Sequence, residues 1–344
     1  MQTARRSPCC STADRQLNLT IDHFGDIYLH ASSVRAWSQT YSQLTPGPLS
    51  SVLVQLDGPR CQLFRELIDK RVVQQGEAPK GRICFAVPLS ITGTVRMQGR
   101  MADDSSVFVL RPGEDFTFHM PMGMDMLAIT FDQGMFERAL ADSSTPDEVS
   151  KLLRQPVVQV PADRLALSRD RLLSLFEGAL AWPHFTTTPE GERQLEQALT
   201  GELIELLTDP QCDKTQRHGS TSDSFIVEKA HRFTINDAAH PPSVSDLCQR
   251  LRISRRTVQN SFRRVAQTTP IDYIRSLRLN GVHRDLMSTS ARDTTIGDVA
   301  ARWGFFHLSH FAADYRALFG ELPSQTARSD ADRTRTMRLT NGAA

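Results

Sequence analysis

Four side chains in the C-terminal third have types and spacing suited to reading the edges of DNA base pairs. Arg256, Gln259, Asn260 and Arg263 stand at offsets of 0, 3, 4 and 7 residues, so a helix would place them in one stripe. Arginine pairs with the acceptors of guanine, and glutamine and asparagine pair with adenine. The alternative is a solvated polar face of the kind that most surface helices carry.

The apolar residues of the same segment predict the helix that would carry this stripe. Val258, Phe262 and Val265 recur at helical spacing on the opposite side, where they would face a core. Ser254 precedes them and is a favourable N-cap residue. We therefore expect a helix over 254–265, with its polar stripe turned outward.

An internal repeat gives this helix a context. The stretch SVSDLCQRLRIS (243–254) aligns with TIGDVAARWGFF (295–306) at an offset of 52 residues. Both copies begin with a hydroxyl residue followed three positions later by aspartate, which is a short form of the capping box. Each copy then predicts a short helix, a tight turn and a second helix, which is the helix-turn-helix arrangement.

The turn residues differ between the copies. Gly304 supplies a permissive backbone in the second copy, whereas Arg252 occupies the corresponding position in the first. We expect Arg252 to adopt a left-handed conformation, at a cost of about 1 kcal/mol.

The second copy has a weaker polar face. Ser309 and His310 are its candidate base-reading residues, and Ala313 stands where the first copy has Asn260. A buried, hydrogen-bonded His310 is the alternative for that side chain. Candidate phosphate-binding residues follow from the positive or polar side chains around both second helices: Arg255, Arg263, Arg264, His307 and Arg316.

A long helix is predicted between the copies, over 269–287. Thr269 is its N-cap and Pro270 its first helical residue, the position where proline is preferred. Such a helix would hold the two helix-turn-helix units rigidly, so one subunit would reach two successive major grooves about 34 Å apart.

The charge distribution agrees with a nucleic-acid partner. Residues 243–328 contain 13 arginines, no lysine and 7 acidic residues, a local charge of +6, whereas the rest of the chain carries −5. A basic segment on an acidic body is typical of a polyanion-binding domain. The alternative is that arginine is simply the preferred surface base.

Composition excludes several classes of protein. No run of 18 apolar residues occurs, so no membrane span is expected. The six cysteines form no C-x-x-C pair, which argues against a disulfide framework or a zinc finger and favours a cytoplasmic location.

The N-terminal half predicts a different fold. Short apolar runs between Ser50 and Phe131, separated by glycine and proline, indicate an all-β barrel or sandwich. Amphipathic helices are expected over 171–182 and 192–207, packed on the β region, on each other or across a dimer. Trp37 and Tyr41 are expected on one helix, either in a pocket for a cationic ligand or in a core.

Enzymatic chemistry finds little support. Glu114, His119 and Asp125 stand near one another, but no His-x-His pair occurs, so no metal site is expected. No nucleophile elbow, Walker loop or dinucleotide fingerprint is present. The expectation is a protein that is not an enzyme and has no cofactor. The alternative is a cupin-type metal enzyme with a C-terminal helical interaction module.

The C-terminal third resembles the AraC/XylS family of bacterial transcription regulators. The resemblance rests on SRRTVQNSFRR (254–264), TPIDYIRSLRLN (269–280), VAARWGFFHLSHFAADYRALFG (299–320) and Pro323. It implies base contacts from Arg256, Gln259, Asn260, Ser309, His310 and Ala313. The family often has a basic residue at the position of Ala313, so poorer base reading is expected from the second helix here.

The resemblance also implies partners and an architecture. The fold would be α+β and multidomain, with a cupin-like β-barrel flanked by helices and an all-α domain with two helix-turn-helix units. The partners would be double-stranded DNA, RNA polymerase, a small-molecule effector and a second copy in a homodimer.

Within the family, the chain is most similar to regulators of ethanolamine operons, through residues 36–50, 254–260, 278–280 and 303–315. That closer similarity suggests activation of a catabolic operon, with ethanolamine and adenosylcobalamin as candidate effectors. The expected organisation is a disordered tail (1–18), an effector and dimerisation domain (19–209), a linker (210–221), a DNA-binding domain (222–328) and a second disordered tail (329–344).

Overall fold

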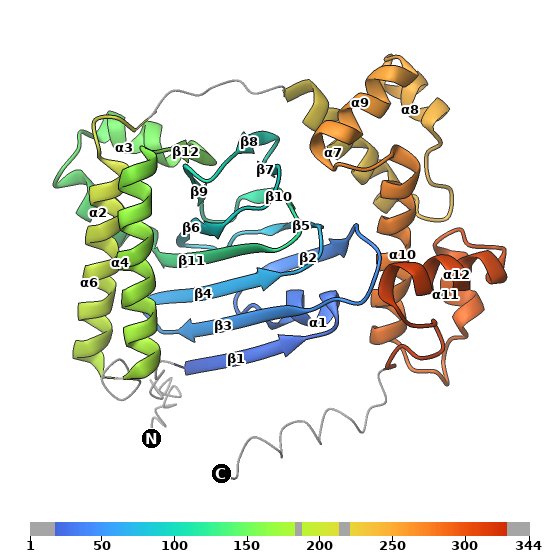
Figure 1. Cartoon of the computed structure of the whole chain (residues 1–344), viewed down its shortest axis with the longest axis horizontal. Helices are drawn as coiled ribbons and strands as arrows, with labels where there is room; N and C mark the ends of the chain where they lie inside the picture. The colour runs from blue at the N-terminus through green and yellow to red at the C-terminus, as the bar shows by residue number, and fades with distance from the viewer. Residues whose placement is uncertain (1–17, 183–187, 213–220, 329–344) are drawn as a thin grey trace, which may run out of the picture.

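The structure is a computed structural model that describes residues 18–182, 188–212 and 221–328 (Figure 1). The expected tails at 1–18 and 329–344 lie outside the described residues, except for Asn18, and so does most of the expected linker. A β region with two layers of strands occupies the middle of the molecule, between a pair of long helices and the C-terminal helices.

In the residues that the structure describes, twelve strands form two antiparallel sheets. The larger sheet has the order β1-β3-β4-β11-β6-β9-β12, and the smaller has the order β2-β5-β10-β7-β8. The strands of the larger sheet are β1 (Asn18–Phe24), β3 (Ser51–Asp57), β4 (Cys61–Ile68), β6 (Arg82–Ser90), β9 (Ser106–Leu110), β11 (Met124–Asp132) and β12 (Val157–Gln159). Those of the smaller sheet are β2 (Ser38–Gln43), β5 (Val72–Glu77), β7 (Val95–Met97), β8 (Arg100–Ala102) and β10 (Asp115–Met120).

The expected β domain is confirmed as two sheets, but the expected cupin-like barrel is not closed. In the described chain the larger sheet ends at β1 and β12, the smaller ends at β2 and β8, and no ladder joins them. The sequence pattern could not distinguish these cases, because barrels and sandwiches both consist of short strands separated by glycine and proline.

The larger sheet is buried on both faces. On β6, Phe85 belongs to the core beneath the long helices, whereas Cys84 and Ala86 belong to the core between the two sheets. Successive side chains of a strand point to opposite faces, so a strand covered on both sides becomes a continuous apolar run. This explains the unbroken sequence ICFAV at 83–87.

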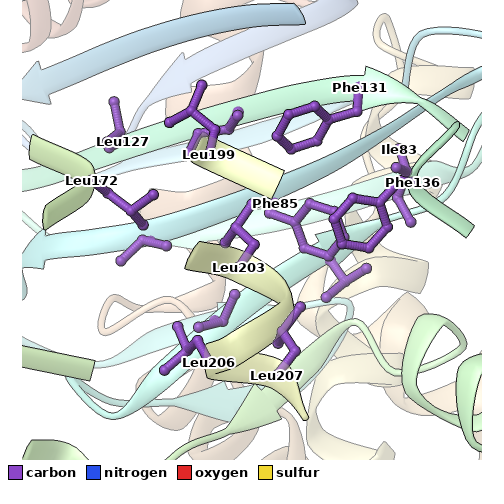
Figure 2. Close-up of a cluster of buried hydrophobic side chains, with 14 of the residues drawn as sticks. Ile83, Phe85, Leu127, Phe131, Phe136, Leu172, Leu199, Leu203, Leu206 and Leu207 are labelled. Atoms are coloured by element: carbon purple, nitrogen blue, oxygen red, sulfur yellow. The ribbon is translucent and has the colours of Figure 1, made fainter. Parts of the chain in front are cut away.

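Between β11 and residue 212, four helices of the described chain cover the outer face of the larger sheet. They are α2 (Gln133–Ala141), α3 (Pro146–Leu153), α4 (Ala162–Ala181) and α6 (Pro189–Leu207). Figure 2 shows Leu199 and Leu203 of α6 packed over Phe85 and Leu127 of the sheet. The two predicted amphipathic helices are confirmed, and they pack on the sheet and on each other.

The prediction of a helix for Trp37 and Tyr41 is wrong. Trp37 lies in the loop before β2, and Tyr41 lies within β2, opposite Gln74 of β5. The rings of Phe64 and Phe116 pack edge-on against Trp37 at centroid distances of 5.8 Å. The polar segment SQTYSQ forms a strand because it pairs with β5. Its own residues do not indicate a strand, since strand preference depends strongly on the neighbouring strands.

The C-terminal part is helical, and a short helix, α1 (Ile27–Ser33), lies in the β region. The C-terminal helices are α7 (Thr221–Asn236), α8 (Val244–Leu251), α9 (Arg255–Val265), α10 (Pro270–Ser288), α11 (Ile296–Arg302) and α12 (Leu308–Phe319). Among all described residues, no helix combines the length and apolar character that a bilayer crossing needs.

Candidate nucleic-acid interface

The first helix pair, α8 and α9, forms through the predicted local signals. Ser243 caps α8 in a capping box with Asp246, and the Ser254 side chain caps α9. The connecting residue Arg252 has φ 55° and ψ 44°, so the predicted left-handed conformation is confirmed. The amide of Ile253 donates to the Cys248 carbonyl at 3.1 Å, which closes the turn.

Helix α9 presents its polar stripe to solvent. Val258, Phe262 and Val265 are buried in a core that α7 and α10 share. On the other side, Arg256 and Gln259 are exposed and Asn260 is half-buried. The structure thus places the three candidate base-reading residues of the first helix on one accessible face.

The arginines of α9 differ in their partners. Within the described chain, Arg255, Arg256 and Arg263 are exposed and form no ion pair. Arg264 instead lies 3.1 Å from the buried Asp223 carboxylate of α7. Asp223 offsets the charge of Arg264, which sequence spacing could not show because the two residues are 41 positions apart.

The second helix pair, α11 and α12, repeats this arrangement. Thr295 and Asp298 form the capping box of α11. Gly304 has φ 74°, and a Cβ atom there would lie 2.5 Å from the Ala239 carbonyl oxygen, so glycine is required. The apolar side of α12 is buried through Phe311, Tyr315 and Leu318.

The candidate residues of α12 are all accessible. His307, Ser309, His310 and Arg316 are exposed, and so is Ala313. The alternative of a buried His310 is therefore wrong. Position 313 carries only a methyl group on this face, so α12 offers fewer hydrogen-bonding groups than α9 does.

Helix α10 fixes one pair relative to the other. Its N-terminal half packs with α9 and its C-terminal half with α11 and α12. A Cβ atom on Gly281 would lie 2.2 Å from the Trp303 ring, so this ring seats directly on the helix backbone. Arg278 donates from Nε to the Trp303 carbonyl at 2.6 Å, and Trp303 Nε1 donates to Asp285 at 2.8 Å.

The same helix contacts the β region through buried polar groups. The side chain of Asn280 accepts a hydrogen bond from the backbone amide of Gln43 and donates one to the backbone carbonyl of Gln43, both at 2.9 Å. His283 pairs with Asp26, the N-cap of α1. Sequence reasoning missed these residues. The sequence feature that could have identified them is the presence of polar side chains at positions of a long helix that are expected to be buried.

A histidine–tyrosine cluster lies at the same contact. His119 Nε2 of β10 is 3.4 Å from the Tyr273 hydroxyl, and His231 Nδ1 of α7 is 2.8 Å from it. Burial lowers the pKa of His119 and of His231 to about 3. Both imidazoles are therefore neutral near pH 7.

The residues considered for a metal site do not converge. Glu114 is paired with Arg111, Asp125 with Arg65, and His119 faces Tyr273. Within the described part of the chain, no group of three or more metal-ligating side chains is close enough to hold a metal ion.

Comparison with known proteins matches residues 247–329 to the model of a family described as "Helix-turn-helix domain". The XylDLEGF operon transcriptional activator 2 of Pseudomonas putida is 32% identical over 124 residues, which are 36% of this chain and 76% of that protein. Another XylDLEGF operon transcriptional activator of the same species is 30% identical over 145 residues, 42% of this chain and 44% of that protein. The match thus spans less than half the length of this second activator.

Among solved structures, the AraC-like transcriptional activator CuxR is similar with a TM-score of 0.35 and 14% identity, over 67% of this chain and 80% of that one.

We predict that acidification weakens the contact between the β region and the helices. Both buried histidines have a pKa below that of the unfolded chain, so the unfolded state binds more protons between about pH 6.5 and 3. Their stabilising contribution is complete above pH 6.5 and is lost as the pH falls. Because the unfolded state binds up to two more protons than the folded state, the free energy of unfolding falls by at most about 2.7 kcal/mol for each pH unit of acidification.

Urea unfolding at several pH values from 6.5 to 4.5 measures this slope. The double variant His119→Gln/His231→Gln keeps hydrogen-bonding groups near Tyr273 but cannot titrate, so its slope should be smaller than that of the wild type. Equal slopes would show that the two histidines titrate normally.

Proposed function

This chain belongs to the AraC/XylS family of transcriptional regulators, and we propose that it is a sequence-specific DNA-binding activator of a catabolic operon. The observation that carries the proposal is the face of α9, where Arg256 and Gln259 stand exposed on a helix fixed by a capped turn. Side chains of these types read base edges in the major groove. The relatives named above are transcriptional activators of operons.

The two second helices have different tasks in this proposal. Arg256, Gln259 and Asn260 read bases from α9, and Ser309 and His310 make the fewer base contacts of α12. Phosphate contacts come from Arg255, Arg263, His307 and Arg316, all of which are exposed. Arg264 contributes less than its neighbours, because Asp223 already neutralises it.

The proposed division of labour follows the architecture. Residues 222–328 bind duplex DNA through two helix-turn-helix units, and residues 19–209 bind the effector and a second copy of the chain. The protein works in the cytoplasm, where it activates transcription through contact with RNA polymerase. The polar contacts of Asn280 and His283 with the β region offer a route by which an effector favours one domain arrangement over another.

The effector is proposed to bind between the two sheets. There, Glu66 is wholly buried, with Oε1 2.7 Å from His30 Nε2 and no hydrogen-bond partner for Oε2 in the described chain. Burial, and then the charge of this carboxylate, raises the pKa of Tyr41. A buried carboxylate near aromatic rings suits an organic cation, which agrees with ethanolamine, alone or with adenosylcobalamin.

A groove between α4 and α6 supports a homodimer. It has a volume of about 560 Å³ and an almost wholly apolar lining, including Leu175, Ala179, Leu195 and Ala198. Trp182, at the end of α4, is 73% exposed beside it. Large apolar side chains around an open apolar groove mark an association surface, and a second copy supplies a matching surface by two-fold symmetry.

We predict that Arg256→Ala weakens binding to the preferred duplex by about 1–3 kcal/mol and relaxes specificity at one base pair. The matched control is Arg138→Ala on the exposed side of α2, which removes the same charge from the β region. Selection from random duplexes identifies the preferred sequence, and titration of each variant measures the loss. If wild type shows no sequence preference, the proposed function is wrong.

We predict that ethanolamine raises the melting temperature of the full chain. A ligand at about a hundred times its Kd adds about 2.7 kcal/mol to the free energy of unfolding. Glu66→Gln should abolish the shift while preserving side-chain shape, since the ammonium group loses its counter-charge. Thermal melts with ethanolamine, adenosylcobalamin and both together make the test, and no shift in any of them would contradict this assignment.

We predict that Ala198→Arg converts a dimer into a monomer, because it places a charge in the apolar groove. Gln197→Arg is the control on the same helix, at an exposed position that does not line the groove. Light scattering measures the mass of each variant. A wild type that is monomeric at micromolar concentration would disprove this interface.

A further inference from the structure

A second groove lies beside α9, the first base-reading helix, and Arg255 is the one lining residue to which a role in DNA binding has been assigned. It has a volume of about 410 Å³ and is formed by the start of α8, the start of α9 and one side of α10. Its lining residues are Pro241, Pro242, Ser243, Val244, Ser245, Arg255, Ile271, Ile274, Arg275 and Arg278.

All the charged side chains that line this groove are positive. Its lining contains three arginines and no acidic residue. Carboxylates nearby compensate only one of them, since Arg275 lies 3.3 Å from Asp272 and 3.5 Å from Asp314. Arg255 and Arg278 have no acidic partner in the described chain.

Arg278 is the most constrained of the three. Its Nε donates to the Trp303 carbonyl, and its guanidinium stacks on the Phe305 ring at 4.1 Å from the centroid. Burial, followed by the repulsion from Arg275, lowers its pKa to about 10. A half-buried cation held in place without a counter-charge is stabilised by any anion that enters the groove.

Backbone amides add to this positive potential. The capping box satisfies Asp246 N and Ser243 N, but the amides of Val244 and Ser245 belong to the first turn of α8 and have no acceptor within the helix. Both residues line the groove. The N-terminal end of the helix dipole therefore points at the same space as the arginines.

The groove also lies between the two helix pairs. Arg255 is the first residue of α9 and stands next to the base-reading Arg256. On the other side, Arg278 stacks on Phe305 in the turn before α12, and Arg275 reaches Asp314 within α12. A duplex whose successive major grooves receive α9 and α12 would present its intervening backbone to this region.

We propose that this groove binds one backbone phosphate of the duplex, between the two base-reading contacts, through Arg255, Arg278 and the amides of Val244 and Ser245. The inference rests on the proposed DNA-binding function and adds a fixed phosphate site to it. The site sets the register of both recognition helices on the duplex, because phosphate contacts position a protein and base contacts specify the sequence.

Ser245→Glu tests the site without removing any of its structural contacts. Ser245 is exposed at the second position of α8, where a carboxylate stabilises the helix slightly. The new charge competes with the phosphate for the groove. Ser245→Gln is the matched control, with nearly the same size and no charge.

In the full chain, we expect Ser245→Glu to weaken binding to every duplex by about tenfold near physiological salt and to reduce the salt slope by about one. Base preference should not change. Ser245→Gln should bind within about twofold of wild type, since it adds no charge. Equal affinities for the two variants would overturn the proposal.

Replacing single phosphates of the preferred duplex by uncharged methylphosphonates locates the contact. We expect one position between the two contacted major grooves where the replacement weakens wild type and has no further effect on Ser245→Glu. The absence of such a position would overturn the proposal. The proposal would also be overturned if the groove bound millimolar inorganic phosphate while the duplex was bound, since the site would then serve a free anion.

The results of these binding experiments distinguish a failure of the phosphate site from a failure of the proposed DNA-binding function. If wild type binds no duplex selectively, the proposed function fails. If wild type binds selectively and both variants at Ser245 bind equally well, only the phosphate site fails. Melting temperatures of the variants show that each one is folded.

Discussion

The packing of α10 is the constraint on which the rest of the structure depends. This helix belongs to the cores of both helix pairs and also contacts the β region. Gly281 admits the Trp303 ring against its backbone, so the second pair cannot shift without losing that contact. A rigid helix shared by two cores sets the distance and angle between α9 and α12, and two successive major grooves require a fixed distance.

The contact between α10 and the β region is of a different kind. It combines the hydrogen bonds of Asn280 and His283 and the Tyr273 cluster with two apolar side chains of the β region, Leu44 and Val73, which join the core of the first helix pair. Buried polar contacts specify one arrangement but contribute little net stability. Such an interface holds the domains in register and separates at modest cost, as an effector-controlled regulator requires.

Local signals allowed much of the DNA-binding region to be predicted. The capping residues Ser243, Ser254 and Thr295 act within three positions of their partners, and the left-handed Arg252 follows from its alignment with Gly304. The exposed stripe of α9 follows from helical periodicity. The base-reading roles of these residues stay predictions, since geometry shows only that the side chains are accessible.

The sequence by itself determined the helices, turns and apolar faces, because each depends on residues a few positions apart. Tertiary structure alone decided which groups meet over long separations. It paired Arg264 with Asp223, put Tyr41 in a strand beside β5, and left the sheets unclosed. It also gathered Arg255 and Arg278 around one groove. The physical reason is that partners far apart in the chain leave no periodic trace in either segment.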